Sequence, residues 1–284
     1  MPYQKAINIL QGGAVIAECG PMRLVINASV GKVPQPDMGV RAAEESFRYL
    51  EGVARLRGLL GKRFSEIPED MDNPLAIKMV RSVLAIGNED LTPLAAVAGT
   101  IGDAVADFLF NRGMTKVVVD NGGDVAVRLK GGEAVTVGIR SNIDNHDLSQ
   151  VISLEPAISS WGVATSGLGG RSLTRGVASA ATVIASSASI ADAAATAIAN
   201  ASYVEDDHVI QRPAKEIDPN TDIPEFPVTV KVGPLSEEKK TMAISMALER
   251  AADLIRKEVI LGAFVDVKGK VAMTDFFQER LVEF

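Results

Sequence analysis

A carboxylate and a hydroxyl lie one helical turn apart in an alanine-rich stretch. Asp192 and Thr196 are four residues apart, and the composition predicts a helix over residues 189–200. Both side chains then share one helix face, so their oxygens could hold Mg²⁺, which is commonly bound by one or two protein carboxylates together with water and phosphate. A simpler interpretation is that Ser189 and Asp192, which have capping-box spacing, only stabilise the start of this helix.

A glycine-rich stretch follows one predicted strand, and a second predicted strand separates it from this helix. Its groups suit binding of a phosphate or diphosphate, because amides and hydroxyls donate hydrogen bonds and a guanidinium adds charge. The residues are Thr165, Ser166, Gly167, Gly169, Gly170, Arg171 and Ser172. The Gly-x-Gly-Gly spacing precedes a strand-like segment and no Gly-Lys-Ser/Thr ending is present, which excludes Rossmann and Walker A loops. A flexible surface loop is the alternative.

A third polar motif, Asn121, Gly122, Gly123 and Asp124, lies between two valine-rich segments. It predicts a tight β-hairpin, because such a turn needs residues that tolerate positive φ. The same turn could present backbone N–H groups to a phosphate or to the polar edge of a flavin or pterin ring. The motif therefore indicates a hairpin with or without a ligand.

Nucleophilic catalysis finds no support in the remaining residues. The two histidines lie in polar, loop-like sequence, and Cys19 is the only cysteine. Neither a Ser/His/Asp nor a Cys/His arrangement is indicated, so we assign no catalytic residue.

In their order along the chain, these motifs resemble those of the ApbE-like family, whose members include FAD:protein FMN transferases. The similarity covers about residues 92–201. The three matching motifs are residues 121–124, 164–167 and 191–196, and residues 94–99 precede them at the place of the family's Gly-Gly-Ile-Ala-Lys-Gly helix entrance. Three motifs in the correct order are more specific than any one of them.

The resemblance implies a fold, a metal and a cofactor. We expect an α+β protein of two tunnelling-fold-like units of antiparallel sheet, with long helices on one face, forming a single domain over residues 1–284. The implied ligands are Mg²⁺ on Asp192 and Thr196, and FAD or a related flavin nucleotide contacted by residues 121–124 and 165–172. The implied activity acts on the FAD diphosphate or transfers FMN, and the cation would neutralise the diphosphate.

The sequence departs from the family pattern at two places. The family's lysine in Gly-Gly-Ile-Ala-Lys-Gly falls near Gly99, and its His-x-x-Asp-Pro-x-Thr-Gly segment is absent before the metal-binding helix. Residues 217–222 resemble that segment but come later and lack the histidine. An alternative function is therefore a non-catalytic or differently specific protein that binds a flavin, a pterin or another nucleotide-like ligand. A third is an interaction protein that docks through residues 205–227.

Local patterns predict the elements that position these motifs. We expect helices from residue 37, over 73–86, 92–111, 189–200 and 236–257. We expect strands over 6–10, 14–18, 22–30, 117–119, 125–129, 134–139, 151–154, 158–165, 177–186, 228–232, 259–265 and 270–274. Residues 205–227 are acidic and rich in proline, which predicts a long loop.

Composition restricts the partners. A chain of 284 residues with 47% hydrophobic and 23% charged residues can bury a large core. The net charge of −7, without a basic stripe, argues against nucleic acid. The most apolar segment, 177–201, is too rich in Ala and Ser to span a membrane, and the amino terminus lacks a signal-peptide pattern. We therefore expect a cytoplasmic protein, in which sheet edges at both chain ends allow a homodimer and any protein acceptor is unidentified.

Overall fold

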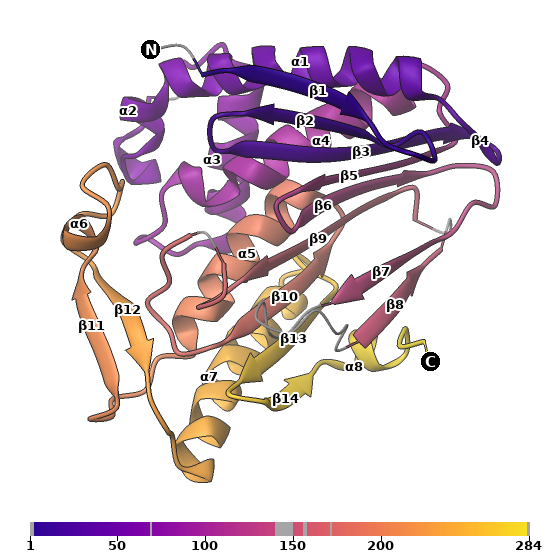
Figure 1. The fold of residues 1–284 in the computed structure, drawn as a ribbon. Helices are drawn as coiled ribbons and strands as arrows, with labels where there is room; N and C mark the ends of the chain where they lie inside the picture. Colours follow the sequence, from indigo (N-terminus) through magenta and orange to yellow (C-terminus); the bar gives the residue numbers. More distant parts are fainter. Residues whose placement is uncertain (1–2, 69, 140–149, 156–157, 171, 283–284) are drawn as a thin grey trace.

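The computed structural model describes residues 3–68, 70–139, 150–155, 158–170 and 172–282, and its centre is one antiparallel sheet (Figure 1). The sheet has ten strands, and its two edge strands come from the two ends of the chain. In spatial order the strands are β1 (Lys5–Ile9), β2 (Val15–Cys19), β3 (Met22–Val30), β5 (Lys116–Asn121), β6 (Asp124–Leu129), β9 (Ser160–Ser166), β10 (Ala180–Ala185), β13 (Gly262–Val267) and β14 (Lys270–Met273), with β4 (Val33–Pro34) paired to β3.

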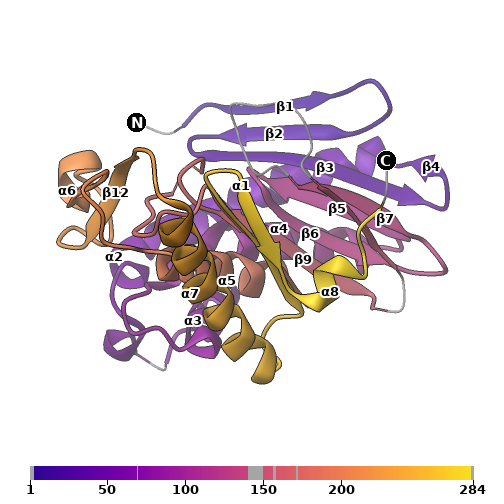
Figure 2. The ribbon, with the colours of Figure 1, turned by 90° about the horizontal axis from the view of Figure 1, so that it is seen from below.

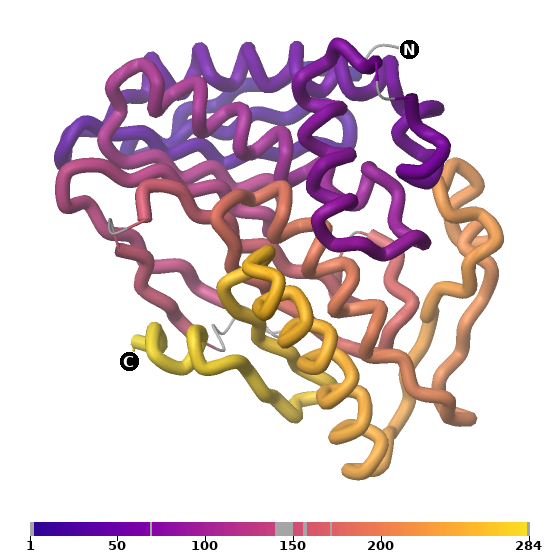
Figure 3. Tube along the Cα trace, turned by 180° about the vertical axis from the view of Figure 1, so that it is seen from behind, coloured from indigo at the N-terminus to yellow at the C-terminus, as the bar shows by residue number. Residues whose placement is uncertain are grey.

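Long helices cover one face of this sheet (Figure 3). They are α1 (Pro36–Arg55) on β2 and β3, α4 (Val97–Phe110) on β5 and β6, α5 (Ala188–Ala201) on β9 and β10, and α7 (Glu237–Arg256) on β13. Helix α3 (Pro74–Ile86) packs on α5 from outside. Buried Ala, Val, Ile and Leu side chains fill the space between sheet and helices. The predicted α+β class with helices on one face is confirmed.

The opposite face of the sheet is covered over part of its area. Strands β7 (Val135–Ile139) and β8 (Gln150–Leu154) form as predicted, but they pair with each other in a separate sheet, and β8 also forms a β-bridge from Ile152 to Leu281. Together with α8 (Asp275–Gln278) they bury Trp161, Phe264 and Phe277 against β6, β9, β10 and β13. The central strands are therefore packed on both faces.

The predicted helix over residues 92–111 consists of two parts. A short 3₁₀ helix, η2 (Pro93–Ala96), leads into α4. Within the described residues, Pro93–Phe110 is the one helical stretch long and apolar enough to cross a membrane, and 56% of it is buried inside the fold. This stretch packs as a core helix against β5 and β6.

Residues 205–227 are more regular than the predicted long loop. They contain β11 (Val209–Pro213) and the single turn α6 (Ala214–Ile217), and β11 pairs with β12 (Pro227–Val232). This hairpin lies on the side of the molecule opposite β7 and β8, near α2 (Arg57–Leu60) (Figure 2). The short helix η1 (Phe64–Glu66) follows α2. The segment thus contains a strand and a helical turn rather than forming an extended docking loop.

Candidate functional site

A cleft of about 400 Å³ opens where η2, α4, α5, the β5–β6 turn and the β11–β12 hairpin meet. Eight of the predicted site residues line it, namely Asn121, Gly122, Asp124, Thr165, Gly170, Ser172, Asp192 and Thr196. Gly123, Ser166, Gly167 and Gly169 are outside this lining. Arg171 lies outside the described residues. All three predicted motifs therefore contribute to the same cleft.

Asp192 binds a neighbouring helix instead of capping its own. Helix α5 begins at Ala188, and the Ser187 hydroxyl accepts the hydrogen bond from the Ile190 amide, so the predicted capping box that begins at Ser189 is wrong. The Asp192 carboxylate instead accepts a hydrogen bond from the Gly99 amide at 2.9 Å. This contact fixes the carboxylate at the N-terminus of α4, where the helix dipole favours a negative charge.

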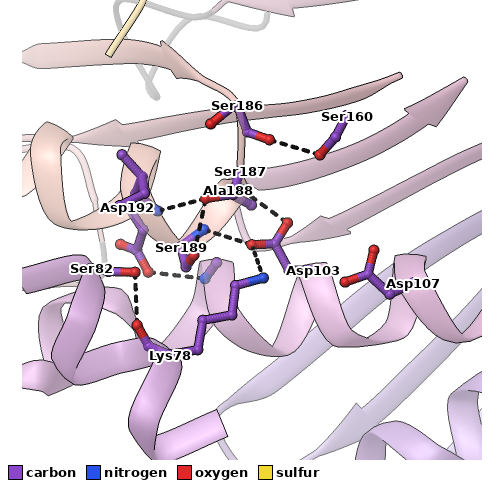
Figure 4. A network of polar contacts seen from close by, with 12 residues as sticks. Lys78, Ser82, Asp103, Asp107, Ser160, Ser186, Ser187, Ala188, Ser189 and Asp192 are labelled. Carbon is purple, nitrogen blue, oxygen red and sulfur yellow. Dashed lines mark hydrogen bonds and ion pairs between the residues drawn. The ribbon is translucent and has the colours of Figure 1, made fainter. Parts of the chain in front are cut away.

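Asp103 makes the reverse contact, from α4 to the start of α5. Its carboxylate accepts hydrogen bonds from the amides of Ala188 at 3.1 Å and Ser189 at 3.0 Å (Figure 4). It is fully buried and also pairs with Lys78 at 2.8 Å and Arg128 at 2.9 Å. Each of the two helices is thus held at its N-terminus by an aspartate of the other, an arrangement that we call the reciprocal cap.

A glycine lets the two helices approach closely at this point. A Cβ atom on Gly99 would lie 2.1 Å from the carbonyl oxygen of Ala188. No side chain fits there without moving a helix, because real Cβ contacts are much longer. In the match over residues 94–99 the family's lysine corresponds to Ala98, which lines the cleft, and the family's last glycine corresponds to Gly99.

Asp124 places a second carboxylate beside Asp192. No hydrogen bond within the described part of the chain reaches this carboxylate, which follows the β5–β6 turn at the start of β6. Burial raises the pKa of Asp124 well above its ordinary value, and the neighbouring charges of Asp192 and Asp120 raise it further. A bound cation would remove this repulsion.

Burial also raises the pKa of Asp192, to about 7. Hydrogen bonds from the amides of Gly99 and Ala98 act in the opposite direction because they favour the charged form, whereas Asp103 adds to the rise. The carboxylate is enclosed by protein on most sides and still faces the cleft. Such a group is available to a ligand that brings positive charge.

The donor atoms at this end of the cleft suit Mg²⁺. The Thr196 hydroxyl donates to the Asp192 carbonyl oxygen at 3.1 Å, which leaves oxygen lone pairs free to face the cleft. No three Asp, Glu, His or Cys side chains converge among the residues that the structure describes. A metal would therefore bind Asp124, Asp192 and Thr196 and complete its shell with water or phosphate oxygens. We call these three residues the metal end of the cleft.

The β5–β6 turn forms the hairpin expected from its sequence. Gly122 and Gly123 have φ of 70° and 112°, and Asn121 pairs with Asp124. The Gly123 amide donates to the Asp120 carboxylate at 2.8 Å, and the Asn121 side chain donates to the Ala98 carbonyl oxygen at 3.0 Å. These contacts hold the turn beside the start of α4.

The glycine-rich loop uses several of its amides internally. Leu168 and Gly169 donate to the carbonyl oxygens of Ala178 and Ser179, and Gly170 donates to that of Gly167. These three amides are therefore engaged within the protein, and phosphate binding by this loop stays a prediction. Thr165 and Ser172 line the cleft, and the Thr165 hydroxyl also shares a hydrogen bond of 2.8 Å with the Thr182 hydroxyl, in which either can be the donor.

Several cleft residues were not predicted as site residues. Arg57, Asp90, Thr92, Arg175 and Phe226 also line it, and Asp218, Thr221 and Asp222 come from the segment with Asp-Pro-x-Thr similarity. That similarity was the only local signal for this part of the site. The other residues reach the cleft through contacts between segments far apart in sequence.

The fold and cleft define an ApbE-like α+β protein. The flavinyl transferase ApbE of Pseudomonas stutzeri, solved in its apo form, matches with a TM-score of 0.50 over 99% of each chain. The sequence identity is 15%, so this likeness concerns the fold. The family model described as AbpE bacteria matches residues 7–273, and the chain belongs to this family.

Sequence relatives occur among methanogenic archaea. A UPF0280 protein of Methanosarcina acetivorans is 36% identical over 167 residues, which cover 57% of this chain and 64% of the relative. A UPF0280 protein of Methanopyrus kandleri is 47% identical over 109 residues, covering 38% of this chain and 42% of the relative. The match thus spans less than two thirds of the length of each of these relatives.

Proposed function

We propose that this protein binds a flavin nucleotide, FAD or a close relative, together with Mg²⁺, and that it acts on the diphosphate or transfers FMN. The observation that carries this proposal is the pair of neighbouring carboxylates, Asp124 and Asp192, facing the cleft beside the Thr196 hydroxyl. Family membership and the fold of a flavinyl transferase support the choice of nucleotide. If FMN is transferred, a protein acceptor would be the second substrate, and its identity is separate from the choice of nucleotide.

Different residues of the cleft would bind the metal and the phosphate groups. Asp124, Asp192 and Thr196 would hold Mg²⁺, which when bound supplies neutralising charge for a diphosphate. The reciprocal cap keeps Asp192 in one orientation, so little reorganisation is needed on binding. Thr165 and Ser172 would donate hydrogen bonds to phosphate oxygens, and Asn121 would position the turn beside the ligand.

A binding protein without transfer activity is the second candidate. The observation that favours it is Ala98, which lines the cleft where the family's motif has its lysine and so supplies no amino group. In this case the same cleft would still bind a metal and a nucleotide-like ligand. The two candidate functions differ only in whether the bound nucleotide is converted to products.

Thermal unfolding tests ligand binding. With Mg²⁺ present, FAD at a hundredfold above Kd is expected to stabilise the protein by about 2.7 kcal/mol. Asp192→Asn should abolish most of this gain, because it removes one of two charges that face the cation. Asp107→Asn, which changes a half-exposed aspartate outside the cleft lining, serves as the control and should keep the gain. Unchanged unfolding with FAD, FMN, ADP and a pterin would contradict the proposal.

Product analysis separates the enzyme from the binding protein. If the protein is a transferase, incubation with FAD, Mg²⁺ and a threonine-containing acceptor should yield AMP and flavin attached to the acceptor. In the absence of an acceptor, hydrolysis should yield AMP and FMN. Asp192→Asn should lose turnover while remaining folded by circular dichroism. Tight binding of FAD without any of these products would identify a binding protein.

A further inference from the structure

A second group of cleft residues, separate from the three of the metal end, has a different chemical character. Phe226 and Arg175 line the cleft here, together with Thr92 and Asp222. We call these four residues the far end. None of the four takes part in the proposed metal and phosphate roles, so their arrangement calls for a separate explanation.

Contacts within the protein hold both the backbone and the side chain of Arg175. Its amide donates to the Asn200 side chain at 2.9 Å, and its carbonyl oxygen accepts from Gln211 at 2.8 Å and from Thr229 at 3.1 Å. Its guanidinium forms an ion pair with Asp90. The group is therefore held in place before any ligand arrives, which lowers the entropy cost of binding to it.

The guanidinium of Arg175 lies over the Phe226 ring, 4.9 Å from its centroid. Phe226 is half-buried, and Ile223 and Leu94 add apolar surface to the same cleft. A planar cation fixed on an aromatic ring beside apolar side chains forms a platform on which a flat ring can stack.

A hydrogen-bond acceptor accompanies this platform. The Asp222 carboxylate accepts the hydroxyl hydrogen of Thr92, a buried residue, and keeps further lone pairs for a ligand. Two cations, Arg57 and Arg175, stand against three carboxylates here, Asp90, Asp218 and Asp222, so this part of the cleft disfavours a second phosphate. It suits a neutral ring that carries N–H or amino donors.

We propose that the far end is a subsite for a planar heterocycle with N–H or amino groups, stacked beside Phe226 and Arg175 and hydrogen-bonded to Asp222. The inference deepens the proposed function, because the diphosphate of the same nucleotide would then lie toward the metal end. Both adenine and a flavin ring have this chemistry, and the experiment distinguishes them.

Binding of phosphate-free ring compounds tests the subsite independently of the metal. Riboflavin and adenosine are titrated into the full chain, in the wild type and in Phe226→Leu and Asp222→Asn. We expect Phe226→Leu to weaken the ring compound that binds by about three- to tenfold, because stacking on the aromatic ring is lost. Asp222→Asn should weaken it by about tenfold, because a charge-assisted acceptor is replaced by an amide.

A matched aromatic pair elsewhere provides the control. Arg112, just after α4, lies over the ring of Phe108 on that helix, 3.6 Å from its centroid, and both are outside the cleft lining. Phe108→Leu should leave binding of riboflavin, adenosine and FAD unchanged. Mg²⁺ with pyrophosphate should bind the two far-end variants as it binds the wild type, because pyrophosphate has no ring.

The outcomes separate this inference from the proposed function. Weakened binding of riboflavin alone assigns the subsite to the flavin ring, and weakened binding of adenosine alone assigns it to adenine. If neither ring compound binds the wild type, or if the far-end variants weaken pyrophosphate as strongly as the rings, the subsite is overturned. Failure of FAD to bind with Mg²⁺ while a ring compound still binds would instead remove the proposed function.

Discussion

Gly99 determines how closely α4 and α5 can cross, and the crossing in turn places Asp192 in the cleft. The Gly99 amide holds the Asp192 carboxylate, while its missing side chain admits the Ala188 carbonyl oxygen. One residue thus serves both the packing and the site. The requirement is steric rather than conformational, because this glycine has no positive φ.

Gly99→Ala is therefore expected to destabilise the protein by about 1–3 kcal/mol or more, as overpacking does in a dense core. The matched control is Gly102→Ala in the same helix, where a Cβ atom would meet its nearest neighbour at an ordinary 3.7 Å. This change should be neutral or stabilising by up to about 1 kcal/mol, because alanine favours the helix. Urea unfolding compares the two variants, and equal stability of both would contradict the steric explanation.

At the scale of elements, the reciprocal cap joins α4 to α5 through charges buried between them. Burial by itself would raise the pKa of Asp103, but the charges of Lys78 and Arg128 and the hydrogen bond from Ser189 outweigh it, so the pKa lies below its ordinary value of 3.8. The folded state therefore favours the charged form. Stabilisation from this carboxylate is complete above about pH 4 and is lost as the pH falls through the folded-state pKa.

Asp103→Asn is expected to lower the free energy of unfolding at pH 7 by about 3–5 kcal/mol, because two cations lose a buried partner. Asp107→Asn removes the more exposed partner of Arg128 and should cost about 0–1 kcal/mol. Urea unfolding between pH 3 and pH 7 measures both. The difference between wild type and Asp103→Asn should shrink below pH 4, and a constant difference would contradict the role of the charge.

Local sequence patterns were sufficient to predict most helices and strands, but not the contacts between them. The hairpin at Gly122 and Gly123 and the long amphipathic helices follow from turn chemistry and periodicity, which depend on neighbouring residues. Residues of the cleft such as Asp192 could be proposed because they lie in short motifs. The cap between Asp103 and Ala188 could not, because it depends on how two helices cross.

The whole molecule is organised by one sheet that runs from β1 to β14 without interruption. The helices of both halves pack on its one face, and the two large buried clusters share Val97 among their neighbours. A division into two tunnelling-fold-like units stays a prediction. A continuous sheet with connected cores favours a single folding unit.

Unfolding followed by two signals tests this continuity. Trp161 is the only tryptophan and lies buried on β9, near the middle of the sheet, so its fluorescence reports on the centre. Far-UV circular dichroism reports on all helices and strands. We expect the two urea transitions to coincide, as they do for one cooperative unit. Separate midpoints would indicate two independently unfolding halves.

Parts of the cleft depend on this global arrangement and were beyond sequence patterns. Asp222 and Phe226 reach the far end because the β11–β12 hairpin is attached to residues 174–175 by contacts such as that from Thr229 to the Thr174 carbonyl oxygen. Proline and acidic residues in this segment predicted a loop, since their local preferences oppose a strand. Pairing with β12 overrides these preferences.

The crossing at Gly99 also has an evolutionary consequence. A side chain cannot be added there by one substitution without strain, because the Ala188 carbonyl oxygen occupies the place of its Cβ atom and α5 would have to shift. A relative with a side chain at this point must differ from this chain in the spacing of the two helices as well. Directed evolution toward such a variant should therefore succeed only from libraries that vary both helices together.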